Sequence, residues 1–333
     1  MGKEEWPMAA TVKPNEDRPM ADSMQIVDGG AVLFPGATLP LRATLPGFVT
    51  AIERALSGVD VPRYTVAVIQ AEEGTQTLSD IGTTAVIRKY RRRVDGSVNV
   101  VTRGHQRFHL QQYGLGILDQ VTYGQIQIIA EDVPLTAHRI SNGFLPHWAY
   151  RLNDSHRLAQ RAANIWNQKI RVPNMDSLVE KPSLLSVHIA GKIPVSTGTR
   201  QRLLDVNDMN RLRMAIELLR NIDHIRCKTC RSTIARQRDI LVMSNEGCLG
   251  AYVDPQGHVF EIMTVHTVNG LFPFEEYGFN WFPGYTCRNA LCGRCGYRVG
   301  WHFTTTNEIL RPGTFWGLET LQMAEEQIPQ MEL

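Results

Sequence analysis

The sequence predicts an α+β protein that is mostly β, with a first β domain, a set of helices and then a second, cysteine-bearing β domain of antiparallel sheets. Three observations predict this class. Short apolar runs alternate with turn residues from 31 to 130, apolar residues recur at helical spacing between 155 and 225, and two Cys-x-x-Cys pairs enclose another strand-rich region. With 333 residues, 43% of them hydrophobic, the chain is long enough for two cores.

Charge and hydropathy exclude two classes of partner. The formal net charge of +2 is too small to indicate a nucleic-acid surface. The basic run from Arg88 to Arg93 lies in a strand-like alternation, so we interpret it as a solvated strand edge, with a phosphate-binding patch as the alternative. No apolar window approaches the roughly 20 residues that a membrane helix needs. We therefore expect neither nucleic acid nor membrane as a partner.

The cysteines and the ends of the chain bear on the compartment. Six cysteines, four of them in Cys-x-x-Cys pairs, do not match a secreted disulfide framework. Residues 1–23 are rich in Pro, Glu, Asp and Lys and contain no apolar run, so we do not expect them to form a signal peptide. We expect a disordered tail over 1–26, a C-terminal tail over 327–333, and a cytoplasmic or nuclear location.

The first β domain is predicted from short apolar runs. Residues 31–34 and 39–41 flank Pro35-Gly36 and predict a strand, a turn and a strand. Residues 46–56 predict a short helix with proline in its first turn. The other runs predict strands at 64–69, 81–87, 98–110 and 125–130. This spacing is typical of a small antiparallel barrel or of a sandwich.

Two helices are predicted after these strands. The first has Ser155 as its expected N-cap and brings four apolar side chains to one face: Leu158, Ala162, Ile165 and Trp166. This face either packs in the core, or Trp166 joins Trp148 as an aromatic anchor for a partner. The second helix, over about 203–225, is expected to pack on the barrel, with His224 as a cation at its end.

Three motifs in this region carry a resemblance. In order, they are Phe34-Pro-Gly-x-x-Leu-Pro-Leu41, Gly82-Thr-Thr-Ala85 and Gly104-His-Gln-Arg107-Phe108. They resemble the N-terminal substrate-recognition domain of the Lon protease family, which implies that fold for residues 27–225. The sequence has no Gly-x-x-x-x-Gly-Lys-Ser/Thr phosphate loop and so carries no Lon-type ATPase. We interpret Gly104 as a bulge or tight turn and Arg107 as a paired strand residue.

Four cysteines predict a metal site. They form two pairs with the same spacing: Cys227 and Cys230, then Cys292 and Cys295. Each pair can bind one ion through two thiolates, and four thiolates complete a tetrahedral Zn²⁺ shell that has no open position for water. The prediction is one structural zinc ion. A dithiol redox pair is the alternative, but it requires a single Cys-x-x-Cys at the start of a helix.

The region between and after these pairs is strand-like and aromatic. Strands are predicted at 240–243, 251–253 and 259–265, with Asp254-Pro-Gln-Gly257 as a hairpin connection. Aromatic residues follow in three motifs: Trp281-Phe-Pro-Gly-Tyr285, Gly300-Trp-His-Phe303 and Phe315-Trp-Gly-Leu318. Alternation places Trp301 and Phe303 on one face of a strand, and the Pro-Gly turn lets Trp281 face them.

The two cysteine pairs, the hairpin and these three aromatic motifs together resemble the CULT domain, a zinc-binding β-tent, of the cereblon family. With the Lon-like domain ahead of it, the resemblance covers nearly the whole ordered chain. It implies a non-catalytic substrate receptor of a cullin-RING ubiquitin ligase. A helical segment over about 145–172 would dock on the β-propeller adaptor of the ligase. The CULT domain, 226–326, would bind glutarimide-like groups, both C-terminal cyclic imides of proteins and thalidomide-type drugs.

The resemblance also implies site residues. Trp281, Trp301 and Phe303 match three walls of an aromatic cage, and Asn280 matches the backbone segment that pairs with the imide edge. Three hairpin residues match the rim of the pocket: Asp254, Pro255 and Gln256. A flat imide has two apolar faces and a polar edge, so aromatic walls and backbone groups suffice to bind it. Core packing is the alternative for each aromatic residue.

Cys287 departs from the family pattern. Family members carry a tryptophan two residues after the tyrosine of Pro-Gly-Tyr, where this sequence has Cys287. Loss of one indole removes a wall, so we expect at best weak binding of imides and of glutarimide drugs. Cys287 also opens two alternatives to the receptor. One is a redox enzyme similar to methionine sulfoxide reductases, with Cys248 as the resolving partner. The other is a Lon-like peptide-binding scaffold without a ligase.

Overall fold

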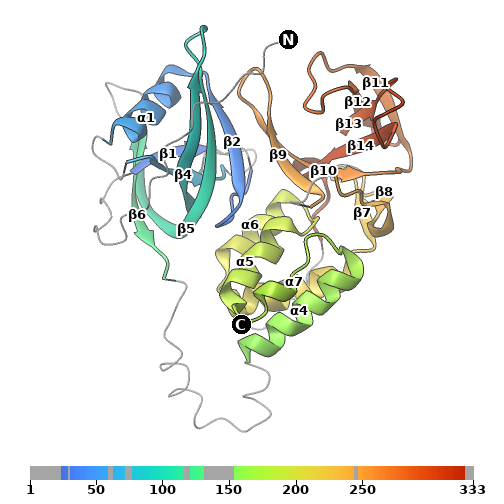
Figure 1. Ribbon diagram of the computed structural model, residues 1–333, viewed down its shortest axis with the longest axis horizontal. Helices are drawn as coiled ribbons and strands as arrows, with labels where there is room; N and C mark the ends of the chain where they lie inside the picture. Colours follow the sequence, from blue (N-terminus) through green and yellow to red (C-terminus); the bar gives the residue numbers. More distant parts are fainter. Residues whose placement is uncertain are drawn as a thin grey trace.

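The computed structural model describes residues 24–28, 31–58, 63–71, 77–115, 121–130, 154–243 and 247–326. Most of the tail predicted over 1–26, the C-terminal tail over 327–333 and the partner-anchor candidate Trp148 lie outside these residues. Strand β1, Met24–Asp28, begins inside the range predicted as tail. It does so because it pairs with β3 on one side and with β6 on the other. The described residues form two β domains with a helix bundle beside both (Figure 1).

The first sheet closes on itself as a barrel. Its order is β2-β5-β4-β3-β1-β6, and an additional pairing of β5 with β6 completes the ring. The β1–β3 pair is parallel and the other pairs are antiparallel. The remaining strands are β2 Thr38–Ala43, β3 Thr65–Ile69, β4 Ile81–Arg92, β5 Val98–Leu115 and β6 Thr122–Ile128. Of the two predicted architectures, barrel and sandwich, the barrel is the one that forms.

The barrel is long on one side. Strand β4 pairs with β3 only as far as Val86, and from Arg88 onward its free edge faces solvent. The basic run therefore lies on a solvated strand end, as predicted. Helix α1, Pro46–Ser57, connects β2 to β3 with a proline in its first turn. It ends at Gly58, whose positive φ of 73° lets its N–H reach the carbonyl of Arg54.

The segment 31–34 is buried but is not a strand, which corrects the prediction made from its apolar run. The Leu33 oxygen accepts a hydrogen bond from a side chain, Thr83 Oγ1 at 2.6 Å, and not from the backbone of a neighbouring strand. Gly104 lies across from it, and a Cβ at this position would stand 2.3 Å from the Phe34 oxygen. Gly104 also borders the register shift between Thr83 and Ala85 in the β4–β5 pairing, so the predicted bulge is present and the predicted alternative, a tight turn, is not. The close approach of the Phe34 carbonyl is what requires a glycine there.

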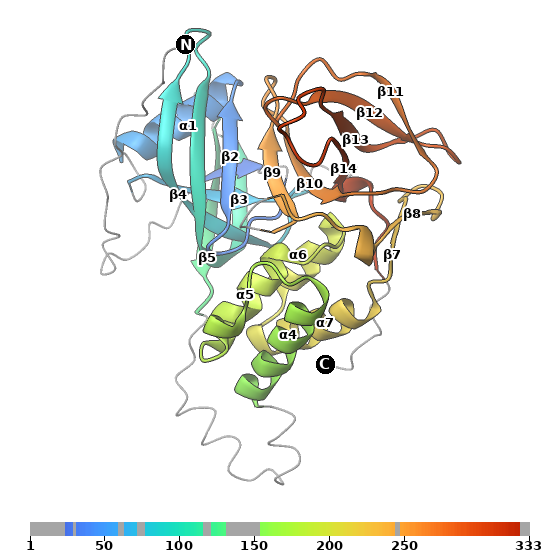
Figure 2. The same ribbon diagram turned by 45° about the vertical axis from the view of Figure 1, so that its right-hand side comes forward.

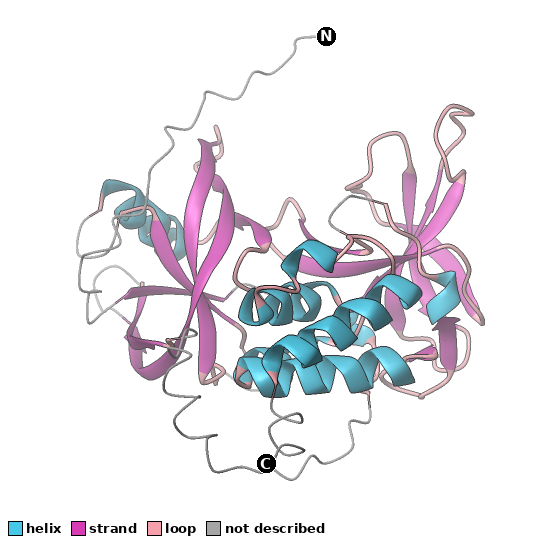
Figure 3. Ribbon diagram, turned by 60° about the horizontal axis from the view of Figure 1, so that its bottom comes forward, coloured by secondary structure: helices cyan, strands magenta, loops and turns pink. Residues whose placement is uncertain are grey.

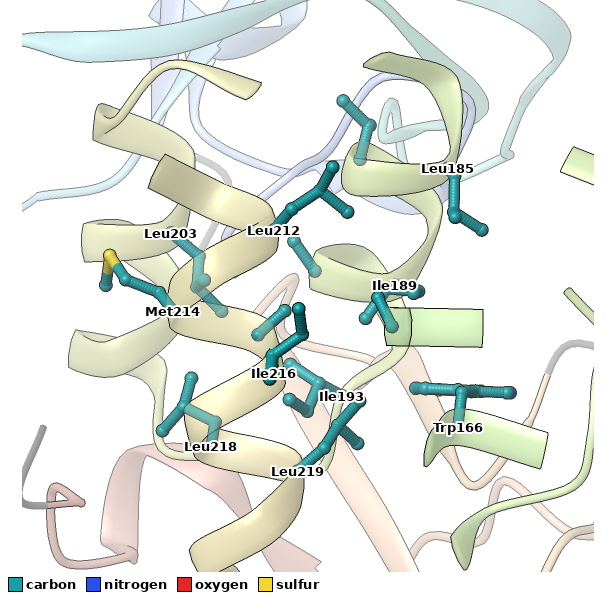
Figure 4. Packing of buried hydrophobic residues seen from close by; sticks show 14 of the residues in the cluster. Trp166, Leu185, Ile189, Ile193, Leu203, Leu212, Met214, Ile216, Leu218 and Leu219 are labelled. Atoms are coloured by element: carbon teal, nitrogen blue, oxygen red, sulfur yellow. The ribbon is translucent and has the colours of Figure 1, made fainter. Parts of the chain in front are cut away.

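Four helices form a bundle with its own core (Figures 3 and 4). They are α4 Ser155–Lys169, α5 Pro182–Lys192, α6 Thr197–Asp205 and α7 Asp208–Asn221. Trp166 is fully buried among them, and its Nε1 donates to the Pro173 oxygen at 2.8 Å. Trp166 is thus a core residue and not a partner anchor. The N-cap of α4 is Asp154, not Ser155, because the Asp154 carboxylate accepts the His156 N–H at 3.0 Å.

The single helix predicted over 203–225 is two helices. Helix α6 ends at Asp205, and Asn207 caps α7 by accepting the Asn210 N–H at 2.9 Å. The apolar spacing continues across this break, so periodicity alone did not reveal it. His224 is not a helix end either, because it begins the short strand β7, His224–Arg226. Among the described residues, no helix is long and apolar enough to cross a membrane.

The second domain is an antiparallel sheet with a small hairpin. The sheet order is β11-β12-β13-β14-β10-β9, and β7 pairs separately with β8, Thr233–Arg236. The strands of the sheet are β9 Leu249–Val253, β10 Val259–Val265, β11 Leu271–Glu276, β12 Thr286–Cys292, β13 Arg298–Thr304 and β14 Thr314–Glu319. The strand expected at 240–243 is reduced to one bridge, Ile240 with Val265. The predicted mostly β, α+β class is confirmed.

The three parts contact one another through buried polar groups. Arg107 is paired with Thr83 in the β4–β5 ladder, as predicted, and its side chain donates to the carbonyls of Leu204 and Val206. Arg200 of α6 forms a buried ion pair with Glu261 of β10. The β9–β10 hairpin lies beside β2 of the barrel (Figure 2). These contacts fix the second sheet relative to the rest of the chain.

Candidate functional site

The four predicted metal ligands converge. Cys227 and Cys230 lie at the β7–β8 turn, and Cys292 and Cys295 lie at the β12–β13 turn. Their sulfur atoms all lie within 4.8 Å of one another. Two pairs are close, with Cys227 Sγ 3.7 Å from Cys295 Sγ and Cys230 Sγ 3.6 Å from Cys292 Sγ. The predicted convergence is confirmed, and the cluster can hold a metal ion.

The two turns have the same backbone design. The Arg231 N–H donates to the Cys227 oxygen at 2.9 Å, and the Gly296 N–H donates to the Cys292 oxygen at 2.8 Å. Both donors have a positive φ, 60° at Arg231 and 74° at Gly296. The Ser232 hydroxyl, 3.0 Å from Cys230 Sγ, lowers the pKa of that thiol, whereas burial raises the pKa of the Cys227 thiol. The thiolate form, which binds metal, is thereby favoured at Cys230.

Trp281 and Trp301 meet as the motifs suggested. Trp301 lies on β13, and Trp281 lies in the loop between β11 and β12. Their ring centroids are 4.9 Å apart in an edge-to-face arrangement at 82°. The side chain of Trp281 is held by a hydrogen bond, because its Nε1 donates to the Val253 oxygen at 3.0 Å. Phe303 lies further along β13, where it is fully buried and stacks on Phe315 at 4.8 Å.

Asn280 shapes the loop that carries Trp281. Its amide donates to the carbonyls of Phe282, at 2.7 Å, and Tyr285, while its oxygen accepts the Phe282 N–H at 2.9 Å. The side chain of Asn280 is therefore used inside the loop. Among the described residues, the backbone groups of 278–280 have no hydrogen-bond partner. Gly278 and Phe279 are exposed and Asn280 is half-buried.

The residues of the β9–β10 hairpin contact two different parts of the protein, the aromatic residues and the barrel. Asp254 is buried and closes the hairpin by accepting the His258 N–H at 2.9 Å. The residue before it, Val253, accepts the Trp281 indole, so the base of the hairpin adjoins the aromatic residues. The tip faces the barrel instead, because the Gln256 oxygen accepts the Thr44 hydroxyl at 3.1 Å. Pro255 lies at this tip.

Two aromatic residues that the motifs did not indicate fill the site. Phe260 of β10 contacts Trp281 and Trp301, with centroid distances of 5.6 and 5.1 Å. Tyr277, just before the loop, contacts the same two indoles, both at 5.5 Å. Trp301 is 0% exposed as a result. The strand alternation of β10 was the available signal, since it places Phe260 opposite Glu261 and hence on the aromatic side.

Arg298 is a further residue that sequence reasoning missed. Its guanidinium carbon lies 4.6 Å from the centroid of Trp301 and 5.7 Å from that of Phe260. The other side of the guanidinium pairs with Glu319 of β14 at 3.0 Å. A cation over an indole face is an attractive contact, and here it covers the site.

Cys287 is buried in the same cluster as Trp301 and Phe303. Its side chain is 5% exposed and lies opposite Phe303 in the β12–β13 pairing. Burial raises the pKa of the Cys287 thiol to about 12, and it does the same to Cys248. The two thiols lie in different clusters of buried side chains. Protonated, separated thiols do not suit the nucleophile and resolving pair of a sulfoxide reductase.

Comparison with known proteins agrees with the motifs. Residues 29–221 match the family model of the ATP-dependent protease La (LON) substrate-binding domain. The chain is 29% identical over 352 residues to protein cereblon of Xenopus tropicalis, which covers 90% of this chain and 76% of that protein. Protein cereblon of Danio rerio is 28% identical over 349 residues, which covers 90% and 80%. A solved Lon N-terminal domain protein from Xanthomonas campestris is 19% identical, covers 57% of this chain and 95% of that one, and has a TM-score of 0.40. Both predicted resemblances are confirmed.

Proposed function

The chain belongs to the family of the ATP-dependent protease La (LON) substrate-binding domain and is cereblon-like over 90% of its length, and on that premise we propose that it is the substrate-recognition subunit of a cullin-RING ubiquitin ligase. In this role the chain binds and positions a substrate and carries no catalytic residue. Residues 27–225 form the Lon-like part and residues 226–326 the CULT domain.

The segment 145–172 is the part that docks on the β-propeller adaptor. Trp166 is used in the core, so the contact comes from the opposite, exposed face of α4 and from the residues ahead of it. Arg157 and Arg161 lie one turn apart on that exposed face. Arginine is enriched at protein interfaces, which makes this pair the first place to test the contact.

The metal ion of the cysteine cluster is zinc. Four sulfur ligands at about 2.3 Å from a tetrahedral Zn²⁺ lie about 3.8 Å from one another. The close pairs, at 3.7 and 3.6 Å, match that edge. All four positions of the ion are then taken by thiolates, so the ion stabilises the domain by joining its two turns and takes no part in chemistry.

The aromatic site binds the cyclic imide of a substrate. The observation that carries this proposal is the Trp281–Trp301 pair, directly preceded in the chain by residues 278–280, whose backbone groups have no hydrogen-bond partner within the described part of the chain. Indole rings cover the faces of a flat imide, while backbone groups pair with its N–H and carbonyls. The substrates are proteins with a C-terminal cyclic imide, and glutarimide drugs bind the same site weakly.

Affinity purification of the tagged full-length chain from cells, followed by mass spectrometry, tests the receptor assignment. The β-propeller adaptor and the cullin are expected with the wild type and are expected to be lost with the double variant Arg157→Glu and Arg161→Glu. The matched control is Arg88→Glu and Arg93→Glu, which reverses two exposed charges on the barrel and leaves the complex intact. Recovery of bound peptides without adaptor or cullin would show that the chain is a peptide-binding scaffold and not a receptor of a ligase.

A further inference from the structure

The aromatic site is filled by its own side chains. Trp281, Tyr277 and Phe260 all form edge-to-face contacts with Trp301, at centroid distances of 4.9, 5.5 and 5.1 Å. The guanidinium of Arg298 lies over the same indole at 4.6 Å. A flat ligand needs an indole face at van der Waals distance, and Trp301, at 0% exposed, offers none. One of these side chains has to move before a ligand can bind.

We infer that Phe260 is the side chain that closes the site and that a ligand binds only when its ring swings away; the inference rests on the proposed imide-binding function. The Trp281 ring is held by the hydrogen bond from its Nε1 to the Val253 oxygen. The main chain of Tyr277 is held by its N–H, which donates to the Cys287 oxygen at 2.9 Å. The Phe260 ring contacts the Trp281 and Trp301 indoles and the Arg298 guanidinium, and a phenylalanine ring breaks no hydrogen bond when it rotates.

The backbone under Phe260 is fixed, so the movement is a side-chain rotation. The next residue along β10, Glu261, is held in the buried ion pair with Arg200 at 2.8 Å. On its other edges β10 is paired with β9 and β14. Because successive side chains of a strand point to opposite faces, Glu261 holds the strand from the helix side while Phe260 fills the aromatic side. The ring can therefore leave without any shift of the strand.

Two donors inside the closed site indicate what replaces the ring. Among the described residues, the Trp301 Nε1–H and the Arg298 Nη1–H are buried and have no hydrogen-bond partner. A buried donor without a partner is unfavourable, and an incoming carbonyl oxygen would satisfy it. A planar ring that carries carbonyl groups, such as a cyclic imide, fits this combination. Phenylalanine satisfies neither donor.

Closure by Phe260, and not the small side chain of Cys287, then limits affinity. The apparent affinity for a ligand is reduced in proportion to the fraction of molecules in which the site is open. Cys287 is 5% exposed and lies opposite Phe303 in the β12–β13 pairing, so its thiol is already enclosed. Shortening residue 260 should strengthen binding, whereas enlarging residue 287 should not.

The test compares the full-length wild type with Phe260→Ala, with Phe260→Leu as a second variant in case the alanine protein does not fold. Phe272→Ala is the control, because Phe272 is an exposed phenylalanine on β11 outside the cluster. The proteins are labelled with 5-fluorotryptophan, and Trp301→Phe assigns the Trp301 resonance. Solvent exposure of Trp301 is measured without ligand, and glutarimide is then titrated.

We expect greater exposure of Trp301 and tighter glutarimide binding, by a factor of about ten or more, in the Phe260 variants only. Unchanged exposure in both folded variants, or exposure with an affinity equal to that of the wild type, would overturn the inference. Greater exposure with no glutarimide binding by any of the proteins would uphold the closure and overturn the imide-binding function instead.

Discussion

Arg200 of α6 and Glu261 of β10 form a buried ion pair, 2.8 Å long, that joins the helix bundle to the sheet of the aromatic site. Their side chains are only 3% and 8% exposed. The pair is supported on both sides, since Thr320 donates to the Glu261 carboxylate at 3.1 Å and Arg200 donates to the Gly191 oxygen at 3.1 Å. The helix bundle and the second β domain are thus connected through one guanidinium and one carboxylate.

Removal of one partner from this pair should destabilise the whole protein. Glu261→Ala leaves the Arg200 charge buried and unpaired, so we expect the free energy of unfolding to fall by about 3–5 kcal/mol in urea denaturation. The control is Glu217→Ala, which removes an exposed pair with Arg220 and should cost less than about 1 kcal/mol. A loss no greater than that of the control would show that the pair does not connect the domains.

The zinc content of the purified protein tests the assignment of the four cysteine ligands. Purified protein should contain one zinc ion per chain by plasma mass spectrometry, and Cys295→Ser should abolish it, because a structural zinc site depends on its full set of four ligands. Cys248→Ala, which changes a buried cysteine outside the cluster, should keep the ion. Full zinc content in Cys295→Ser would contradict the assignment of the four ligands.

Enlarging Cys287 should harm stability without improving binding. Cys287→Trp places an indole in a position that is already packed against Phe303, and overpacking of this kind costs about 1–3 kcal/mol. We expect a lower midpoint of thermal unfolding and no gain in glutarimide affinity by fluorescence titration. A gain in affinity would show that the missing indole, and not closure by Phe260, weakens the site.

His302 should make stability depend on pH. Burial and the nearby Arg288 lower the pKa of His302 below its ordinary value of 6.5. The folded protein then binds the proton less readily than the unfolded chain, so the stabilisation is present above pH 6.5 and is lost as the pH falls toward the lowered pKa. Between pH 7.5 and 5.5 the unfolding temperature of the wild type should drop more than that of His302→Gln. Equal drops in the two proteins would exclude His302 as the cause.

Some of the fold could be read from local patterns. The barrel strands follow β-branched runs between turn residues, and the equal spacing of Cys227–Cys230 and Cys292–Cys295 was enough to predict that they converge. The break at Asn207 was not predictable, because apolar periodicity runs through it and only the cap separates the two helices. The burial of Trp166 likewise depends on three other helices that an amphipathic pattern does not identify.

The sequence motifs did not predict the closed state of the aromatic site, for a similar reason. Trp281 and Trp301 stand in recognisable motifs, but Phe260 and Tyr277 reach them across strand pairings that become visible only once the sheet is assembled. Gly104 shows the same limit. The sequence indicated a special glycine, and the structure supplies the reason, which is the Phe34 carbonyl of a segment far away in the chain.

Transfer of ubiquitin in a reconstituted reaction tests whether this chain is an imide-directed substrate receptor. The chain, the β-propeller adaptor and the cullin-RING core would be combined with a model protein that ends in a cyclic imide, and with the same protein ending in the open-chain amide. We predict ubiquitin on the imide-ended protein alone, at a higher yield when the receptor carries Phe260→Ala. Equal modification of both proteins, or of neither by a fully assembled complex, would contradict the assignment of this chain as an imide-directed substrate receptor.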